Sequence, residues 1–183
     1  MPAAGVPARV ITISGEIATG TSTLAAALVD LQPGWRLSKT GDRFREYCQL
    51  HGLSLLDVGS LPDEVHRAFD LEQRAMLEDE QRLVVEGRLA GWLARDLPDV
   101  FRVFCHAPLA VRVARYAQRE QADGTRSLAD IRHRDRGDRE KYRQVYGLVD
   151  YRASEFYQLV LSTAKASPRE LAEVVALRAG LAG

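Results

Sequence analysis

The chain has 183 residues, 46% of them hydrophobic and 27% charged, a composition typical of one globular domain with a single core. Its 25 basic and 25 acidic residues give zero net charge, which argues against nucleic acid or an anionic membrane as its partner. Residues 1–8 lack an apolar core of signal-peptide length and no stretch approaches about 18 apolar residues, so we expect a cytoplasmic protein.

The first element in the chain is a strand, loop and helix that suits phosphate binding. Val10–Ile13 is a β-branched run and Thr23–Val29 is alanine-rich and helix-like. The intervening loop consists of Gly15, Glu16, Ile17, Ala18, Thr19, Gly20, Thr21 and Ser22. Glycines allow a close approach to an anion, and the following helix points unpaired N–H groups at it. The match to a phosphate loop is incomplete, because Thr21 stands where lysine is usual, whereas Ser22 keeps the hydroxyl suited to Mg²⁺.

The next segment predicts a short strand at 35–38 and two helices. The first helix opens at Thr40, with Asp42 near its start and an apolar side formed by Phe44, Tyr47 and Cys48. Residues 53–61 are expected to form a loop or turn, and Pro62 begins a long charged helix that extends to Met76.

The third strand is expected to be apolar and buried, and it ends in chemistry-bearing residues. Residues 82–88 finish with Glu86, Gly87 and Arg88. Because ligands of open α/β sheets lie beyond the carboxyl ends of the strands, this triplet should share an edge with the Gly15–Ser22 loop. Residues 89–96 are expected to be helical, 100–105 to form the fourth strand and 109–119 a helix.

Residues 120–143 are polar and dense in arginine, with few apolar anchors. Such a segment buries little by itself, so it is expected to be mobile until an anion orders it. The alternative is a solvated charged helical pair with ion pairs such as Asp130–Arg134 and Asp135–Arg139. Residues 157–161 should form the fifth strand, and Ser167, Pro168 and Glu170 predict a capping box at the start of a last helix. The alternation of strands and helices predicts that residues 1–183 form one three-layer α/β domain with a parallel sheet.

Taken together, the loop, Thr40-Gly41-Asp42-x-x-Arg45, Glu86-Gly87-Arg88-Leu89-Ala90-Gly91-Trp92 and the arginine-rich segment resemble P-loop nucleoside monophosphate kinases. The chain is most similar to the archaeal-type cytidylate kinases, which also carry threonine in place of the loop lysine. Tyr142-x-x-x-Tyr146-Gly147 matches the family as well. The resemblance implies a five-stranded P-loop kinase fold, a monophosphate-binding region at about 38–80 and a lid at about 120–143.

The resemblance also implies roles for individual residues. Gly15–Ser22 would hold the ATP phosphates, and Ser22 with Glu86 would hold Mg²⁺. Arg45 and Arg88 would grip the acceptor monophosphate, next to Gly41 and Asp42. The closed lid would be lined by Arg115, Arg119, Arg132 and Arg134. The family usually has glycine at Ala18, so either a tighter loop or slightly displaced phosphates are expected. It commonly has aspartate at Gln158, which leaves one supporting role without a residue.

Base selection is expected on the long helix after Pro62. Arg67, Asp70 or Gln73 could hydrogen-bond a pyrimidine edge, with Asp70 accepting from the exocyclic amine of cytosine. Trp92 is interpreted as a packing residue, and Cys48 and Cys105 as buried thiols. The four histidines lack ligand spacing and receive no role.

Three functions therefore remain open from the sequence. The first is an ATP- and Mg²⁺-dependent kinase of CMP and dCMP that binds neither nucleic acid nor membrane. The second is a kinase for another small acceptor, although a hydroxyl acceptor would favour a carboxylate base over paired arginines. The third is a nucleotide-binding regulatory module without turnover, motivated by Thr21 and Ala18. The oligomeric state cannot be read from the sequence.

Overall fold

The structure is a computed structural model that describes residues 7–53 and 61–181. Most of the loop expected at 53–61 lies outside this part. Five strands form one parallel sheet in the order β2-β3-β1-β4-β5. The strands are β1 (Val10–Gly15), β2 (Arg36–Lys39), β3 (Leu83–Glu86), β4 (Val100–His106) and β5 (Leu159–Ser162). The helices are α1 (Thr21–Leu31), α2 (Thr40–Leu50), α3 (Asp63–Asp79), α4 (Ala90–Leu93), α5 (Leu109–Glu120), α6 (Gly124–Tyr146) and α7 (Pro168–Arg178).

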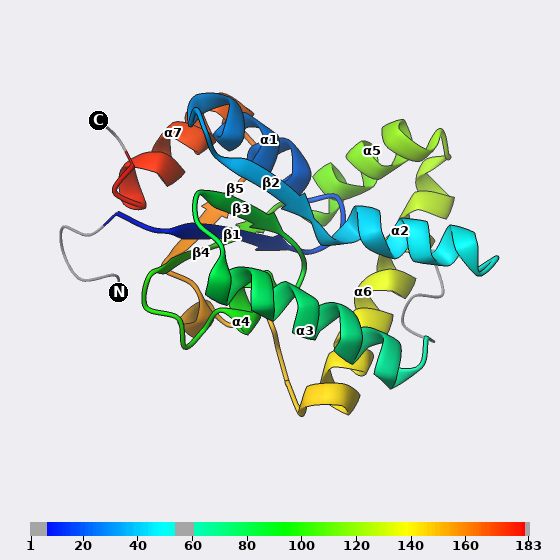
Figure 1. Ribbon diagram of the computed structural model, residues 1–183. Coiled ribbons are helices and arrows are strands. Elements are labelled where there is room, and N and C mark those ends of the chain that lie inside the picture. The colour runs from blue at the N-terminus through cyan, green and yellow to red at the C-terminus, as the bar shows by residue number, and fades with distance from the viewer. Residues whose placement is uncertain (1–6, 54–60, 182–183) are drawn as a thin grey trace.

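Alternate residues of each central strand enter two separate cores, which makes the three layers (Figure 1). On one face Ile11, Val84 and Val103 pack against α1 and α7. On the other face Val10, Val85 and other alternate residues pack against α3, α4 and the tyrosines after α6. Side chains two apart along a strand point to the same side, so each strand serves both layers. The expected three-layer parallel α/β fold is confirmed.

The carboxyl ends of β1 and β3 are held together by a small polar contact. Ser14 Oγ donates to the carbonyl of Gly87 at 2.9 Å and accepts from the amide of Gly91 at 3.0 Å. A Cβ on Gly87 would lie 2.6 Å from both the Thr40 hydroxyl and the Gln73 amide, so only glycine lets the three segments approach. The segment after β3 is therefore fixed against β1, the start of α2 and the middle of α3.

Helices α5 and α6 form a hairpin beyond the carboxyl ends of the strands (Figure 1). Asp123 caps α6 by accepting from the Arg126 amide, and Gly147 ends the helix with a φ of 65°. Much of the arginine-rich segment at 120–143 is thus helical, as in the charged-pair alternative, but the ion pairs differ from those expected. Asp135 pairs with Arg112 of α5 because it faces inward.

The boundaries of two elements differ from expectation. Only one helical turn, α4, forms in 89–96. The carbonyls of Ala94 and Leu97, which follow it, accept hydrogen bonds from the Arg102 guanidinium. The fifth strand begins at Leu159, two residues late, after a 3₁₀ turn at Ser154–Phe156. The capping box of Ser167 and Glu170 is present as predicted. No helix in the described ranges is long and apolar enough to cross a membrane.

Candidate functional site

The loop between β1 and α1 presents a set of backbone amides with no partner in the described part of the chain. No described residue accepts from the amides of Ala18, Gly20, Thr21 or Ser22. Gly20 has a φ of 87° and begins α1, so the loop curls over the positive end of an 11-residue helix. Such an array of N–H groups favours an anion through hydrogen bonds and the helix dipole. The loop therefore has the chemistry of a phosphate site.

Ala18 occupies the position where a glycine was expected. Its φ of 59° lies in the left-handed region, which a side chain adopts only at a cost of about 1–2 kcal/mol. Its methyl group packs against the small apolar cluster of Ile17, Tyr116 and Ile131. The loop thus keeps a conformation that glycine adopts freely, and the contact with α5 and α6 offsets part of the strain.

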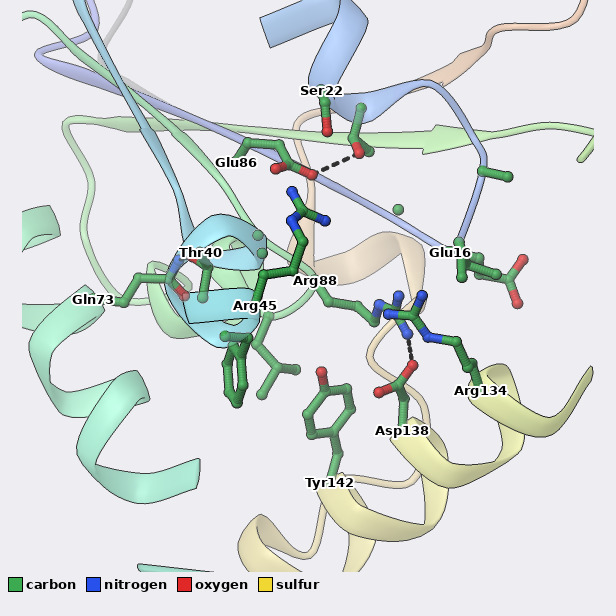
Figure 2. A pocket seen from close by; sticks show the side chains of 18 of the residues that line it. Glu16, Ser22, Thr40, Arg45, Gln73, Glu86, Arg88, Arg134, Asp138 and Tyr142 are labelled. Carbon is green, nitrogen blue, oxygen red and sulfur yellow. Dashed lines mark hydrogen bonds and ion pairs between the residues drawn. The ribbon is translucent and has the colours of Figure 1, made fainter. Parts of the chain in front are cut away.

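Hydroxyl and carboxylate oxygens converge at the first turn of α1. Thr21, at the place of the absent lysine, donates its hydroxyl to Glu86 Oε1 at 2.7 Å. Ser22 is the next residue, and Figure 2 shows its hydroxyl on the same side as Glu86. Oxygen donors of this kind suit a hard cation such as Mg²⁺. The described residues contain no group of three or more His, Cys, Asp or Glu able to hold a metal by themselves, so further oxygens would have to come from a ligand and water.

Two arginines lie together in the wall of the central cleft, whose volume is about 160 Å³. Arg88, just after β3, forms an ion pair with Asp138 of α6 (Figure 2). Arg134, one turn earlier on α6, makes no hydrogen bond or ion pair with a described residue. Burial and the adjacent Arg88 guanidinium lower the pKa of Arg134 to about 10. Two largely buried guanidiniums, of which only Arg88 has a carboxylate partner, form a site that would be stabilised by an anion.

Arg45 reaches the same cleft from α2. Its guanidinium points toward Glu86 in Figure 2, and it also lines a second cavity on the other side of Thr21 and Ser22. It pairs with Asp42, which lies outside the cleft lining, and its side chain is 57% exposed. Gly41 lines the cleft at the start of the same helix. Among Arg45, Arg88 and Arg134, Arg45 therefore has the side chain most exposed to solvent.

A polar wall formed by α3 closes the cleft opposite the loop. Asp70 is 8% exposed and accepts from the Tyr146 hydroxyl, whereas Gln73 donates to the Thr40 hydroxyl. Burial raises the pKa of Asp70 to about 6, although the hydrogen bond from Tyr146 acts in the opposite direction. The exposed Arg67 does not line the cleft; its guanidinium lies 5.9 Å from the Tyr146 ring centroid.

The remaining arginines of the expected set are divided among the cavities. Arg119 lines both the central cleft and the second cavity of about 850 Å³. Arg115 lines only the second cavity, where it donates to the Thr163 carbonyl at 2.6 Å. Arg132 points into an outer cavity of about 400 Å³ behind Glu16, away from Arg134. The phase of α6 separates these two arginines, although they are only two positions apart.

Of the loop residues, Gly15, Glu16, Ile17, Ala18, Thr21 and Ser22 line the central cleft, whereas Gly20 lines the second cavity and Thr19 is buried. Trp92 packs in the core beside Tyr146 and does not line the cleft. Cys48 and Cys105 are buried free thiols, as expected.

Sequence reasoning gave no role to five polar residues of the site. Thr40, His66, Asp138 and Tyr142 line the cleft, and Arg112 holds the loop from behind. Asp138 lies four residues after Arg134, and that spacing on one helix was the available signal. Nothing in the sequence distinguished Arg112 from the arginines around it.

Comparisons with known proteins agree with this geometry. A profile of the cytidylate kinase-like family matches residues 41–165. A cytidylate kinase of Natronomonas pharaonis is 38% identical over 90% of this chain and 86% of its own length. A cytidylate kinase of Thermoplasma acidophilum is 31% identical over 92% of this chain and 90% of its own length.

Solved structures share the fold at lower identity. A shikimate kinase from Acinetobacter baumannii in complex with shikimate aligns with a TM-score of 0.56 and 15% identity, covering 93% of each chain. A gluconokinase from Sinorhizobium meliloti aligns with a TM-score of 0.59 and 15% identity over 94% of this chain and 91% of its own. At these identities the likeness concerns the fold alone.

The backbone of the loop gives a test of the strain at Ala18. Ala18→Gly removes about 1–2 kcal/mol of left-handed strain, but it loses about 0.8 kcal/mol of methyl burial and adds about 0.5–1 kcal/mol of unfolded-state entropy. We therefore expect the free energy of unfolding in urea to change by less than about 1 kcal/mol. The control is Ala25→Gly, at a fully buried position inside α1, which should destabilise by at least about 1 kcal/mol more. Equal losses in both variants would contradict the assignment of strain.

Proposed function

The chain belongs to the cytidylate kinase-like family, and from this we propose that it transfers a phosphoryl group from ATP to a nucleoside monophosphate, with CMP and dCMP as best acceptors. One observation supports this function above the others. The unpartnered loop amides and the buried Arg88–Arg134 pair face one another across a single cleft. A site of this kind suits two phosphate groups brought end to end, since each half offers positive charge to a different anion.

The donor half would be formed by the loop and the second cavity. The amides of Gly15–Ser22 would hold the ATP phosphates, and the cavity between α5 and the segment after β5 has the volume for the nucleoside. Arg115 and Arg119 border this cavity and would therefore lie beside the donor. Without a loop lysine, the guanidinium groups must supply the mobile positive charge.

The acceptor half would be formed by Arg45, Arg88 and Arg134. A guanidinium donates two parallel hydrogen bonds to phosphate oxygens, which fixes the acceptor as well as neutralising it. The acceptor phosphate is itself an anionic nucleophile, so the reaction requires no dedicated general base. These arginines would reduce the repulsion between the two anions and stabilise the charge that develops on the transferred group.

Ser22 and Glu86 are the residues that would hold Mg²⁺ together with ATP. Bound there, the ion would neutralise phosphate charge. The hydrogen bond from Thr21 orients the Glu86 carboxylate, and it leaves the second oxygen of that carboxylate free for the ion or its water.

Asp70 and Gln73 line the cleft and would read the acceptor base. The Tyr146 hydroxyl bonds Oδ2 of Asp70, which leaves Oδ1 to accept from the exocyclic amine of cytosine. Uracil presents a carbonyl at the same position, and a carboxylate would repel it. This contact would select CMP over UMP, as part of a monophosphate-binding region at about 38–80.

Residues 120–143 would act as the lid over both phosphates. Arg134 and Asp138 of this segment already face Arg88, so α6 supplies part of the acceptor site directly. A cover that excludes water would suppress hydrolysis of ATP, the competing reaction. The cytoplasm, where ATP and nucleoside monophosphates meet, is the compartment in which we place this activity.

A panel of acceptors tests the proposed function. ATP consumption should be measured with CMP, dCMP, UMP, AMP, cytidine, shikimate and gluconate, each with Mg²⁺ and again with excess EDTA. We expect turnover with CMP and dCMP that exceeds the others, is abolished by EDTA and returns with added Mg²⁺. Turnover confined to cytidine or the hydroxy acids would favour the small-acceptor alternative, and ATP binding without any transfer would favour a regulatory module.

Arg88→Ala should lower kcat/KM for CMP by two or more decades. The variant removes a buried charge-assisted contact to the acceptor phosphate, an effect on the order of 2–4 kcal/mol in comparable sites. Steady-state kinetics with CMP varied at saturating ATP measures it. Arg95→Ala is the matched control, because Arg95 follows the same strand but stacks on Trp92 outside the cleft, and it should stay within about threefold. A loss below threefold in Arg88→Ala would place the acceptor phosphate elsewhere.

Asp70→Asn should lower the ratio of kcat/KM for CMP to that for UMP by about tenfold or more at pH 7.5, since a hydrogen bond to a charged acceptor contributes about 1.5–3 kcal/mol. The pKa of Asp70, raised by burial to about 6, sets the pH dependence. Above pH 6 the carboxylate is ionised and accepts from the amine, and below it the protonated group no longer does so. The wild-type ratio should therefore fall as pH falls through about 6.

The same ratio in Asp70→Asn should not change across this pH range. Taking a ratio of two acceptors cancels the titration of their phosphates, which is common to both. Asp79→Asn, at an exposed position near the end of α3, is the control and should leave the ratio unchanged. An unaltered ratio in Asp70→Asn would show that another residue reads the base.

A further inference from the structure

Three carbonyl groups of the phosphate loop accept hydrogen bonds from side chains. Thr19 Oγ1 donates to the Glu16 carbonyl at 2.7 Å, and Arg112 Nε donates to the Ile17 carbonyl at 2.7 Å. The Thr19 carbonyl accepts from the Thr163 hydroxyl at 2.6 Å. Because the N–H and C=O of a peptide unit point in opposite directions, outward carbonyls fix the neighbouring amides toward the cleft. These three hydrogen bonds, called the loop anchors below, therefore hold the loop in shape without a ligand.

Arg112 is the charged member of these anchors and the most firmly held. Its side chain is 5% exposed. Besides the Ile17 carbonyl, its guanidinium contacts Glu16 Oε2 at 3.2 Å and Asp135 Oδ2 of α6 at 2.5 Å. A planar guanidinium satisfies three acceptors in fixed directions, whereas a lysine ammonium carries one charge on a flexible stem. The loop, α5 and α6 therefore meet at one side chain.

The position of Arg112 distinguishes it from the arginines of the cleft. It does not line the central cleft but only the outer cavity behind Glu16, so it lies outside both the donor and the acceptor surfaces. Residues 16–18 also contact α5 and α6 through the apolar cluster of Ile17, Tyr116 and Ile131. All support for this part of the loop comes from the side opposite the phosphates.

We propose that Arg112, oriented by Asp135, is a positioning residue that keeps the phosphate loop in its ATP-binding conformation, a role that matters more because the loop has no lysine. This inference rests on the proposed function, since it assumes that the loop binds ATP. A ligand that binds only one conformer loses apparent affinity in proportion to the fraction of that conformer. Loosening the anchor should therefore weaken ATP binding and leave acceptor binding intact.

The test is equilibrium binding of ATP and of CMP, each alone, by calorimetry in the presence of Mg²⁺. We expect Arg112→Lys to raise the Kd for ATP roughly tenfold, as when the competent conformer falls to about a tenth of the population. The Kd for CMP should change by less than about twofold. Asp135→Asn, which retains Arg112 but removes one of its two carboxylate partners, should also raise the Kd for ATP, by a smaller factor.

Arg102→Lys provides the matched control. Arg102 is a buried arginine that likewise donates to backbone carbonyls, those of Phe156 and Ala94, but on the far side of the sheet from the loop. It should lower Tm much as Arg112→Lys does without changing the Kd for ATP. A merely structural role for Arg112 would produce this same pattern, and a lowered Tm with unchanged ATP affinity in both Arg112→Lys and Asp135→Asn would overturn the inference.

Failure of the inference and failure of the proposed function give different results. If wild-type protein binds ATP and phosphorylates CMP but the two variants bind ATP normally, the positioning role is wrong and the kinase assignment stands. If wild-type protein binds no ATP, the proposed function fails and the inference with it. A parallel loss of CMP affinity in Arg112→Lys would also contradict it, because the anchor would then act on the whole cleft.

Discussion

The structure depends on two like charges that lie together, largely buried, on one side of its cleft. Arg88 and Arg134 lie close enough for each to affect the other, and Asp138 is the carboxylate that pairs with Arg88. Removing guanidinium groups from water is unfavourable unless they are paired, and their repulsion adds to that penalty. The fold tolerates the pair because β3, α6 and the tyrosines around them are packed in a common core. A bound dianion would relieve the repulsion, so the unfavourable energy of the free protein becomes affinity for the acceptor.

The loop on the proposed donor side has too little charge rather than too much, since Thr21 stands where lysine is usual. Backbone amides carry only partial charges, and their effect depends on all of them pointing the same way. Outward anchoring of the loop carbonyls supplies that order, and Ala18 is held in a left-handed conformation by its contact with α5 and α6. Thr21 takes a different role from lysine, because its hydroxyl orients Glu86. Positive charge and geometric order are therefore provided by separate groups in this chain.

Local sequence signals predicted the parts of the molecule whose structure is determined locally. The two glycines before α1, the apolar run of β3 and the Ser167–Glu170 capping box each depend on a few adjacent residues. The pairing of Arg88 with Asp138 joins residues 50 positions apart, and the contact of Arg112 with Ile17 spans 95. In a segment with so many arginines, only the phase of a continuous α6 decides that Arg134 faces the cleft and Arg132 the outer cavity. The carbonyls that follow the short α4 likewise bond to Arg102, a residue of the next strand.

Helix α6 joins the two halves of the cleft through residues within one helical turn. Asp135 holds Arg112, and through it the Gly15–Ser22 loop, whereas Asp138 holds Arg88 on the side proposed for the acceptor. Residues three apart on a helix are neighbours with a fixed relative direction, so α6 cannot shift along its axis without disturbing both pairs. A rigid shift of α6 would therefore act on both sides of the cleft, whereas a substitution at Arg112 loosens the loop alone. In the proposed reaction, where ATP must be withheld from water until the acceptor is present, these two ion pairs on one rigid element would provide the connection.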